Sequence, residues 1–329
     1  MKPLSPEKIL YTDALSDTQA QANIRGIRKA YEKIGEVIAF DYRMATRSVG
    51  MIDANDQLVR LAVENGIDFI HLGKGESILG ETIKRIKTVF PAIKIIHFYG
   101  DYRPSPPAWV TDLGRYVDVT FIQGRDEGLR EKYQQAGCRR VEFLNCGTDP
   151  DIFYPQSVDK EYDIVFMANY SKPDKFEWMK GRLELVKAIA SNGFGIHIFG
   201  TGWGKLGETK NITLHPFVAG EAFARECSKA KLALAYGTNK VRGYTSWPRL
   251  LNSMSSGTMV LTKYFPGLED VFENAYDLQW FTREKDLINL VRYYLDNDEE
   301  RKKIAESGRN QVLENHTWNH RIETILSYV

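Results

Sequence analysis

The sequence has few cysteines, no long apolar run and almost no net charge. Its three cysteines, Cys138, Cys146 and Cys227, are too few and too scattered for a disulfide framework or a zinc site, so we expect a protein of the reducing cytoplasm. No apolar run reaches the roughly 18 residues that predict a membrane span, and the N-terminus lacks an apolar signal segment. With 44 Lys and Arg against 43 Asp and Glu, a globally basic nucleic-acid binder is disfavoured.

Two common nucleotide-binding motifs are also missing. The sequence contains no G-x-x-x-x-G-K-[ST], and its first turn, residues 12–17, is not G-x-G-x-x-G. The sequence therefore lacks the motif that is central to phosphate-loop NTPases and the one that is central to dinucleotide dehydrogenases. The stretch Gly200-Thr201-Gly202-Trp203-Gly204 follows a predicted strand, but alone it indicates only a tight turn.

What is present is the composition and rhythm of a two-domain α/β protein. The 329 residues exceed one ordinary core, and 43% apolar with 26% charged residues is typical of a globular chain. Strand-like runs alternate with amphipathic stretches, which predicts a parallel sheet with helices on both faces. In the first half we expect strands at 9–12, 36–40, 67–72, 93–99, 118–122 and 141–144, with helices at 17–34, 53–65, 80–90 and 126–136.

The rhythm breaks at residues 145–160, which contain Gly147, Pro150 and Pro155 and are interpreted as the interdomain linker. It then restarts, with strands expected at 162–167, 195–199, 211–215, 231–236 and 258–262, and helices at 177–191, 221–229, 246–256, 284–295, 298–315 and 319–328. The predicted fold is two Rossmann-like doubly wound domains facing a shared cleft. Residues 1–150 form the first domain, 151–315 the second, and 316–329 a C-terminal helix that packs back toward the first.

The neutral total charge hides one basic segment. Residues 1–155 carry 21 basic and 21 acidic side chains, residues 160–249 carry 14 and 8, and residues 250–329 carry 9 and 13. Local excess charge attracts ligands of the opposite sign. A basic segment balanced by an acidic one suits a small diphosphate better than a long nucleic acid.

The stretch 243–252 lies in that basic segment and predicts an anion site. A turn at Gly243 leads into a helix start that carries Tyr244, Thr245, Ser246 and Arg249. Free main-chain amides and the helix dipole attract anions there, and Arg249 can add a bidentate contact to a diphosphate. The alternative is an ordinary capped helix with a surface arginine.

Two aspartates of the first half are candidate general bases. Asp101 follows the predicted strand 93–99, and Asp13 ends the first strand. A carboxylate at the carboxyl end of a strand faces the ligand side of this kind of sheet. The alternative for Asp101 is a loop residue that caps the 106–114 segment or pairs with Arg103.

Two pairs of residues with metal-ligand spacing are interpreted as structural. Asp149 and Asp151 flank Pro150 in the linker, where Asp-Pro commonly opens a turn. His316 and His320 have the i, i+4 spacing of helical metal ligands but no evident third partner. We therefore expect no metal and no cofactor.

Seven segments of the second half occur in the order of a known family: residues 147–155, 162–169, 182–185, 197–203, 249–262, 266–272 and 316–321. This series resembles the GT-B glycosyltransferases that include the spore-maturation CgeB-like proteins. The resemblance extends from about residue 93 to the C-terminus and is strongest over 162–321. It implies that the second domain binds a nucleoside diphosphate sugar such as a UDP-sugar.

The resemblance also implies where the donor binds. The base would lie against Phe217 and Val218, and the diphosphate on the helix start at 244–249, with Arg182 nearby. One departure concerns Asn252, where the family usually has a Glu that holds the ribose hydroxyls; another expected Glu is replaced by Tyr244. The full predicted donor-binding set is Asn169, Lys172, Arg182, Gly200, Trp203, Phe217, Val218, Tyr244, Thr245, Ser246, Arg249 and Asn252.

Three hypotheses follow. The first is a metal-independent hexosyl- or pentosyltransferase in which Asp101, or in second place Asp13, deprotonates an acceptor hydroxyl; the acceptor is a glycan, a protein, a small molecule or a modified DNA base. The second is a viral-type DNA glycosyltransferase acting on hydroxymethylated bases. The third is a degenerate, non-catalytic nucleotide-sugar binding protein, motivated by Asn252 and Tyr244.

Overall fold

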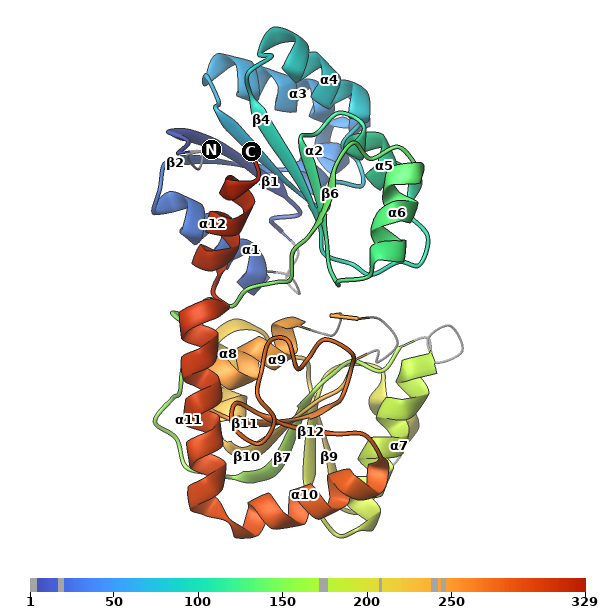
Figure 1. Cartoon of the computed structure of the whole chain (residues 1–329), viewed down its shortest axis with the longest axis vertical. Helices are drawn as coiled ribbons and strands as arrows, with labels where there is room; N and C mark the ends of the chain where they lie inside the picture. The colour runs from blue at the N-terminus through green and yellow to red at the C-terminus, as the bar shows by residue number, and fades with distance from the viewer. Residues whose placement is uncertain (1–4, 17–20, 172–176, 207–208, 238–241, 244–246) are drawn as a thin grey trace. The chain divides into compact units, whose positions relative to one another are not determined.

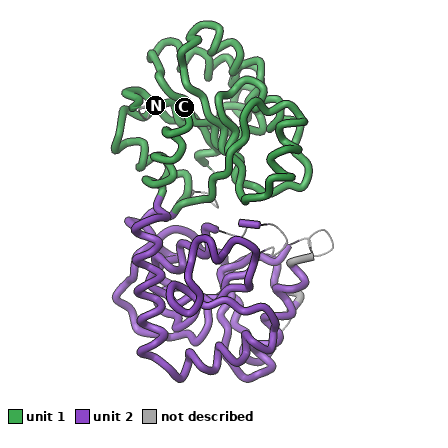
Figure 2. The backbone as a smooth tube through the Cα atoms, in the orientation of Figure 1, with its two compact units in different colours: residues 1–147, 318–329 green, residues 148–317 purple. Residues whose placement is uncertain are grey.

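The structure is a computed structural model that describes residues 5–16, 21–171, 177–206, 209–237, 242–243 and 247–329. The chain divides into two compact units, residues 1–147 with 318–329 and residues 148–317 (Figure 2). Each unit is built on one parallel sheet with helices on both faces (Figure 1). The alternation of strands and helices predicted from the sequence is confirmed in both halves of the chain.

The sheet of unit 1 has six strands in the order β2-β1-β3-β4-β5-β6 within the described residues. Its first strand is apolar on both faces, and Ile9, Leu10 and Tyr11 have no exposed surface, as expected where helices cover both sides of a parallel sheet. The strands are β1 (Lys8–Asp13), β2 (Glu36–Asp41), β3 (Phe69–Gly73), β4 (Lys94–Tyr99), β5 (Val119–Ile122) and β6 (Val141–Phe143).

Two groups of helices cover this sheet. One face packs Leu10, Ile70 and Leu72 against Leu58 and Ile83 of the helices between β2 and β4. On the other face the first and last helices of the chain lie side by side (Figure 1). The helices of unit 1 are α1 (Gln21–Glu32), α2 (Tyr42–Val49), α3 (Met51–Glu64), α4 (Gly80–Val89), α5 (Ala108–Gly114), α6 (Glu127–Gln135) and α12 (Trp318–Ser327).

The last helix of the chain is part of unit 1. The Trp318 ring of α12 lies 6.3 Å from that of Phe98 on β4, and Ile322 and Ile325 are buried. The Arg321 guanidinium donates to the main-chain carbonyls of Asn145 and Cys146 at 3.0 and 3.2 Å. These contacts attach α12 to the end of the unit 1 chain.

Helix α2 is absent from the sequence prediction. Its inward apolar face consists of only Tyr42 and Ala45, whereas Met44, Arg47, Ser48 and Val49 are exposed. This face is too short to predict a helix from the sequence. The helix start is fixed instead by Asp41, whose Oδ1 accepts a 2.9 Å hydrogen bond from the Met44 amide.

The sheet of unit 2 also has six strands within the described residues, in the order β12-β11-β10-β7-β8-β9. The short edge strand β12 was not predicted; its three residues give too little pattern. The strands are β7 (Tyr162–Met167), β8 (Ile196–Phe199), β9 (Ile212–His215), β10 (Ala230–Ala235), β11 (Met259–Lys263) and β12 (Gln279–Phe281).

Helices α7 and α10 cover one face of this sheet, where Ile164 and Ile198 pack on Val186, Ile189 and Leu287. Helix α8 follows β9 along the chain, and helix α9 follows β10. The helices of unit 2 are α7 (Glu177–Ser191), the short 3-10 helix η1 (Trp203–Leu206), α8 (Gly220–Ser228), α9 (Trp247–Ser255), α10 (Glu284–Asp296) and α11 (Asp298–Asn315).

Part of the segment predicted as a linker is packed into unit 2. The Thr148 amide donates to the carbonyl of His316 at 3.0 Å, and Phe153 is buried with its carbonyl bound to Ser255 Oγ at 2.5 Å. Asp149 Oδ1 accepts a 3.0 Å hydrogen bond from the amide of Asp151. The Asp149-Pro150-Asp151 sequence therefore forms the turn expected of it.

Candidate functional site

The strand order of unit 2 places its ligand side between β7 and β10. The chain runs from β7 outward to β8 and β9, then returns to add β10 on the other side of β7. Ligands of such sheets bind outside the carboxyl ends of the strands where the order reverses. Asn169 follows β7 and Tyr236 follows β10, so both lie at this point.

Arg182 joins the two sides of this switch point. The residue is 3% exposed, and its guanidinium donates to the carbonyl of Asn169 at 2.8 Å and twice to the carbonyl of Tyr236, at 3.0 and 3.3 Å. A buried charge requires such hydrogen bonds. Arg182 thus fixes the main chain at the carboxyl ends of β7 and β10, a role that the sequence did not suggest.

The predicted Gly200–Gly202 turn packs directly on the chain that leaves β7. A Cβ at Gly200 would lie 2.6 Å from the carbonyl carbon of Ala168, and one at Gly202 (φ +85°) would overlap the Tyr170 carbonyl oxygen. Asn169 Oδ1 accepts a 2.9 Å hydrogen bond from the Thr201 amide. Both glycines are required by this close approach.

Trp203 is part of the core rather than of an open surface. Its ring is 3% exposed and lies 5.0 Å from that of Tyr170, and Nε1 donates to the carbonyl of Ala168 at 2.6 Å. Of the predicted donor-binding residues that follow β7 and β8, Asn169, Gly200 and Trp203 therefore support one tight pair of loops.

Helix α9 carries the second group of predicted residues. Arg249 is partly exposed in its first turn, whereas Asn252 is buried. Asn252 Oδ1 accepts a 2.7 Å hydrogen bond from the Thr148 hydroxyl, which ties α9 to the beginning of unit 2. The predicted Lys172, Tyr244, Thr245 and Ser246 lie outside the described residues.

The predicted base platform follows β9. Phe217 is 39% exposed, an unusual state for a phenylalanine, and Val218 is partly exposed. The preceding His215 stacks on Phe199, with ring centroids 4.2 Å apart and planes at 7°. Its carbonyl accepts a hydrogen bond from the Gly200 amide at 3.3 Å, so the platform connects to the glycine turn.

In unit 1 the order of the strands reverses between β1 and β3, because β2 lies on one side of β1 and all later strands lie on the other. Asp13 ends β1 and Lys74 follows β3, so both lie at this second switch point. Asp13 Oδ1 accepts from the Ala14 amide at 2.7 Å, and Oδ2 accepts from the Tyr11 hydroxyl at 3.0 Å. Burial raises the pKa of this carboxyl from 3.8 to about 6, against the effect of both hydrogen bonds.

Asp101 lies in a different environment. It is half-exposed, and its carboxylate is 3.5 Å from the Lys74 ammonium. Lys74 itself has a left-handed backbone (φ +51°), which is uncommon for a side chain of this kind. Its carbonyl contacts His97 Nε2 at 2.5 Å, which holds the strained residue in place beside Asp13.

A further polar group at this edge was missed by the sequence analysis. Glu76 accepts hydrogen bonds from the Tyr42 hydroxyl and from Arg43 Nε, the latter at 2.5 Å. The Arg43 and Tyr42 hydrogen bonds, acting against burial, hold the pKa of Glu76 below its usual range. Tyr42 and Arg43 follow Asp41 of β2, so a tyrosine and an arginine directly after a predicted strand were the available signal.

The histidine pair with metal-ligand spacing does not share a helix. His316 follows the last residue of α11, whereas His320 lies within α12. In the part of the chain that the structure describes, no three His, Cys, Asp or Glu side chains are grouped to hold a metal ion. The same residues include no helix that is long and apolar enough to cross a membrane.

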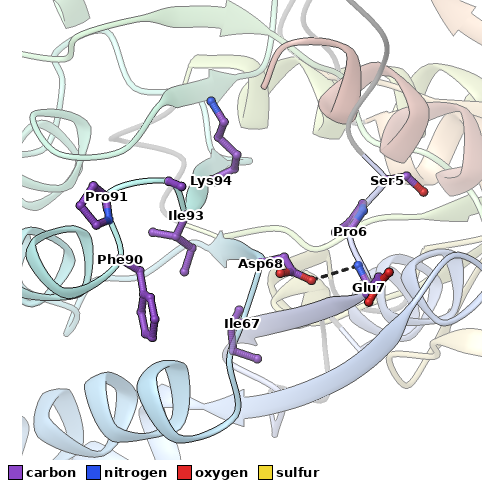
Figure 3. Close-up of a pocket in the computed structure, with 10 residues that line it drawn as sticks. Ser5, Pro6, Glu7, Ile67, Asp68, Phe90, Pro91, Ile93 and Lys94 are labelled. Atoms are coloured by element: carbon purple, nitrogen blue, oxygen red, sulfur yellow. Dashed lines mark hydrogen bonds between the residues drawn. The ribbon is translucent and has the colours of Figure 1, made fainter.

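A pocket of about 530 Å³ opens at the opposite, amino edge of the unit 1 sheet (Figure 3). Ile67, Phe90 and Ile93 contribute its apolar side chains. The Asp68 carboxylate within it accepts hydrogen bonds from the amides of Glu7 and Lys8 at 3.1 and 2.9 Å. Because Asp68 is engaged in fixing the start of β1, and ligands bind at carboxyl edges, we do not assign the functional site here.

Comparison with known proteins gives a match to one part of the chain. Residues 182–327 match the family model described as glycosyl transferase-like. The matched segment begins at Arg182 and includes α9 and the glycine turn. No protein of curated function matches the sequence.

Solved structures show that the chain has the GT-B fold. HepE from Anabaena, crystallised with UDP and glucose, superposes with a TM-score of 0.68 at 14% identity, covering 98% of this chain and all of that chain. Sucrose-phosphate synthase from Thermosynechococcus elongatus gives 0.67 at 15% identity, with 98% of both chains covered. A glycosyltransferase from Rickettsia africae gives 0.67 at 12% identity, again with 98% of both covered.

Proposed function

We propose that the protein transfers a hexosyl or pentosyl group from a nucleoside diphosphate sugar to an acceptor hydroxyl, without a metal ion, and that it belongs to the CgeB-like subgroup of GT-B enzymes. One observation carries the proposal: Arg182, the first residue of the glycosyl transferase-like segment, binds the main-chain carbonyls that follow β7 and β10, where the strand order of unit 2 reverses. HepE, a neighbour in fold, has been crystallised with UDP-glucose. The ordered series of seven sequence segments supports the subgroup.

On the donor side, the proposal gives distinct tasks to several of the predicted residues. Arg249 and the start of α9 neutralise the departing diphosphate, and the exposed ring of Phe217 supports the base. The glycine turn at 200–202 packs on the chain that leaves β7 and so fixes the shape of the loop pair at this edge. Arg182 and Asn252 act behind this surface, since the carbonyls of Asn169 and Tyr236 and the Thr148 hydroxyl engage them.

On the acceptor side, we assign the general base to Asp13 in preference to Asp101. A base works best when its pKa lies near the working pH, and burial raises the pKa of Asp13 to about 6. Asp101 is half-exposed beside the Lys74 ammonium, so its carboxylate is open to solvent and to a cation. In the proposed step Asp13 takes the acceptor proton, the acceptor oxygen bonds to the anomeric carbon, and the bond from that carbon to the diphosphate breaks.

The acceptor remains a hydroxyl of a glycan, a protein, a small molecule or a modified DNA base. The cations beside Asp13 are already paired, Lys74 with Asp101 and Arg43 with Glu76. Phosphate backbones are bound through lysines and arginines that release counterions. The paired state of these two cations favours a neutral, hydroxyl-rich acceptor over DNA.

A second candidate function is a non-catalytic nucleotide-sugar binding protein. The observation in its favour is that the buried Asn252, which stands where the family usually has a ribose-binding glutamate, has its Oδ1 engaged by Thr148. A binding protein needs no general base, so the effect of replacing Asp13 distinguishes the two functions.

The test is an assay of nucleoside diphosphate release from a panel of nucleotide sugars, with and without EDTA and in the variants Asp13→Asn and Asp101→Asn. We expect turnover that EDTA does not reduce, that Asp13→Asn lowers by at least about 100-fold and that Asp101→Asn lowers much less. Donor binding without turnover would instead establish the binding protein, and loss of turnover with EDTA would refute the metal-independent reaction.

A further inference from the structure

The Asp13 carboxyl group sits in a socket formed by Tyr11, Ala14 and Gly73. Its two oxygens accept hydrogen bonds from the Ala14 amide (2.7 Å) and the Tyr11 hydroxyl (3.0 Å). A Cβ on Gly73 would lie 2.5 Å from Asp13 Cγ and would overlap Oδ2. Contacts on three sides therefore fix the position of the carboxyl group.

We propose that Tyr11 and Gly73 are positioning residues for Asp13: Tyr11 orients the carboxyl group and favours its ionised form, and Gly73 leaves the space in which it lies. This inference rests on the proposed function only for its kinetic consequence. The structural part, which concerns the proton affinity of Asp13, holds whatever the protein binds.

Tyr11 fits this role because it is fully buried and its hydroxyl is aimed at Oδ2. The residue has no exposed surface, and burial together with the Asp13 carboxylate raises the pKa of its phenol well above the usual value. The hydroxyl therefore remains protonated and always donates. A hydrogen bond donated to a carboxylate stabilises the charged form by roughly 1.5–3 kcal/mol.

Other charged and titratable groups also face Asp13, and none replaces Tyr11. Arg43 of α2 and Lys74 after β3 lower the pKa of Asp13 through their charge alone. Tyr42 of α2 is bound to Glu76, and Asp41, the register partner on β2, accepts from the amides of Ser16 and Met44.

Tyr31 of α1 provides a matched control. Its side chain is fully buried, and its ring lies 6.4 Å from that of Tyr11. Its hydroxyl contacts His71 Nδ1 at 2.8 Å, and burial lowers the pKa of His71 to about 3, so this second pair is neutral. Tyr31→Phe thus removes a buried phenol oxygen close to Tyr11 without removing a hydrogen bond to the Asp13 carboxyl group.

The test measures the Asp13 pKa by carbon-13 NMR titration in the wild type, Tyr11→Phe and Tyr31→Phe, and in parallel the pH dependence of kcat/KM. Loss of the Tyr11 hydrogen bond should raise the Asp13 pKa by about 1 pH unit, and Tyr31→Phe should leave it unchanged. The acid limb of the kcat/KM profile should move upward with it, so that activity falls at pH 6 and is retained above pH 8.

The outcomes separate the two claims. An Asp13 pKa in Tyr11→Phe that equals the one in Tyr31→Phe overturns the inference. If the pKa moves and the kinetic profile does not, the positioning role stands and Asp13 is not the base of the proposed function. Gly73→Ala gives an independent check: it should lower kcat by at least about tenfold with little change in the KM for the donor, and an unchanged kcat would refute the role of Gly73.

Discussion

The Thr148 hydroxyl donates a 2.7 Å hydrogen bond to Oδ1 of Asn252, a residue 104 positions away in the sequence. Both groups are buried, so neither can exchange the partner for water without opening unit 2. This contact fastens α9, which carries Arg249, to the first residue of the unit.

The first prediction concerns this pair. Thr148→Val keeps the shape of the side chain but leaves the Asn252 oxygen unpaired, which should lower the free energy of unfolding of unit 2 by about 1–3 kcal/mol. Thr148→Ser retains the hydroxyl and serves as the control. Urea denaturation followed by tryptophan fluorescence measures the effect. A Thr148→Val variant as stable as the wild type, together with a less stable Thr148→Ser, would mean that packing of the methyl group, not the hydrogen bond, matters.

The second prediction distinguishes two roles for Arg182. If it holds the carbonyls of Asn169 and Tyr236, Arg182→Met should lower the stability of unit 2 by at least about 3 kcal/mol and reduce donor affinity as a consequence. Arg292→Met, at an exposed position of α10, should change neither. A variant at Arg182 that melts like the wild type but binds no nucleotide would show that the residue contacts the diphosphate directly.

The third prediction concerns the glycine turn after β8. Gly202→Ala places a methyl group on the Tyr170 carbonyl and forces a left-handed alanine, so it should destabilise unit 2 by several kcal/mol, on the order of 3 or more. Gly204→Ala, which meets nothing within 4 Å, should remain within about 0.5 kcal/mol of the wild type. Thermal unfolding of the two variants provides the comparison, and similar melting temperatures would contradict the described packing.

The fourth prediction uses the pKa of Asp13. In the folded protein this pKa is about 6, above the value of about 3.9 in an unfolded chain. The folded state therefore binds more protons between these values, and the contribution of Asp13 to stability decreases as pH rises from about 4 to 6. Asparagine cannot ionise, so Asp13→Asn does not lose this contribution as pH rises. The variant should be more stable than the wild type at pH 8 by about 1–2 kcal/mol, although inactive.

The pH profile of stability checks the sign. The stability gap between Asp13→Asn and the wild type should shrink as pH falls from 6 to 4, where the wild-type carboxyl is also neutral. A gap that is constant across this range would mean that burial does not raise the Asp13 pKa. Urea midpoints at pH 4.5, 6 and 8 are sufficient for this comparison.

The sequence predicted most of the fold because the buried strands carry a strong signal. The last four residues of β7 (Tyr162–Met167) are all apolar and buried, so helices are needed to cover both faces. Helix α2 was not predicted because its apolar residues Met44 and Val49 are exposed and only Tyr42 is buried. Its start depends on the Asp41 cap, a local contact that the pattern of apolar residues does not contain.

The candidate site was only partly predictable for a different reason. Asp13 was found because a carboxylate at a strand end is visible in the sequence. Glu76 and Tyr42 were not, because 34 residues separate them and only the strand order brings them together. Similarly, the sequence suggested a phosphate contact for Arg182, and nothing in it indicated that two distant carbonyls would engage the guanidinium.

The central claim, that unit 2 binds a nucleoside diphosphate, is tested most directly by isothermal titration calorimetry with UDP, GDP, ADP and CDP. The account predicts one-to-one binding of at least one of them in the absence of metal ions. Arg249→Ala should weaken this binding by at least about tenfold, and Arg292→Ala should leave it unchanged. Absence of heat with all four nucleotides, for a folded protein at millimolar ligand, would contradict the account.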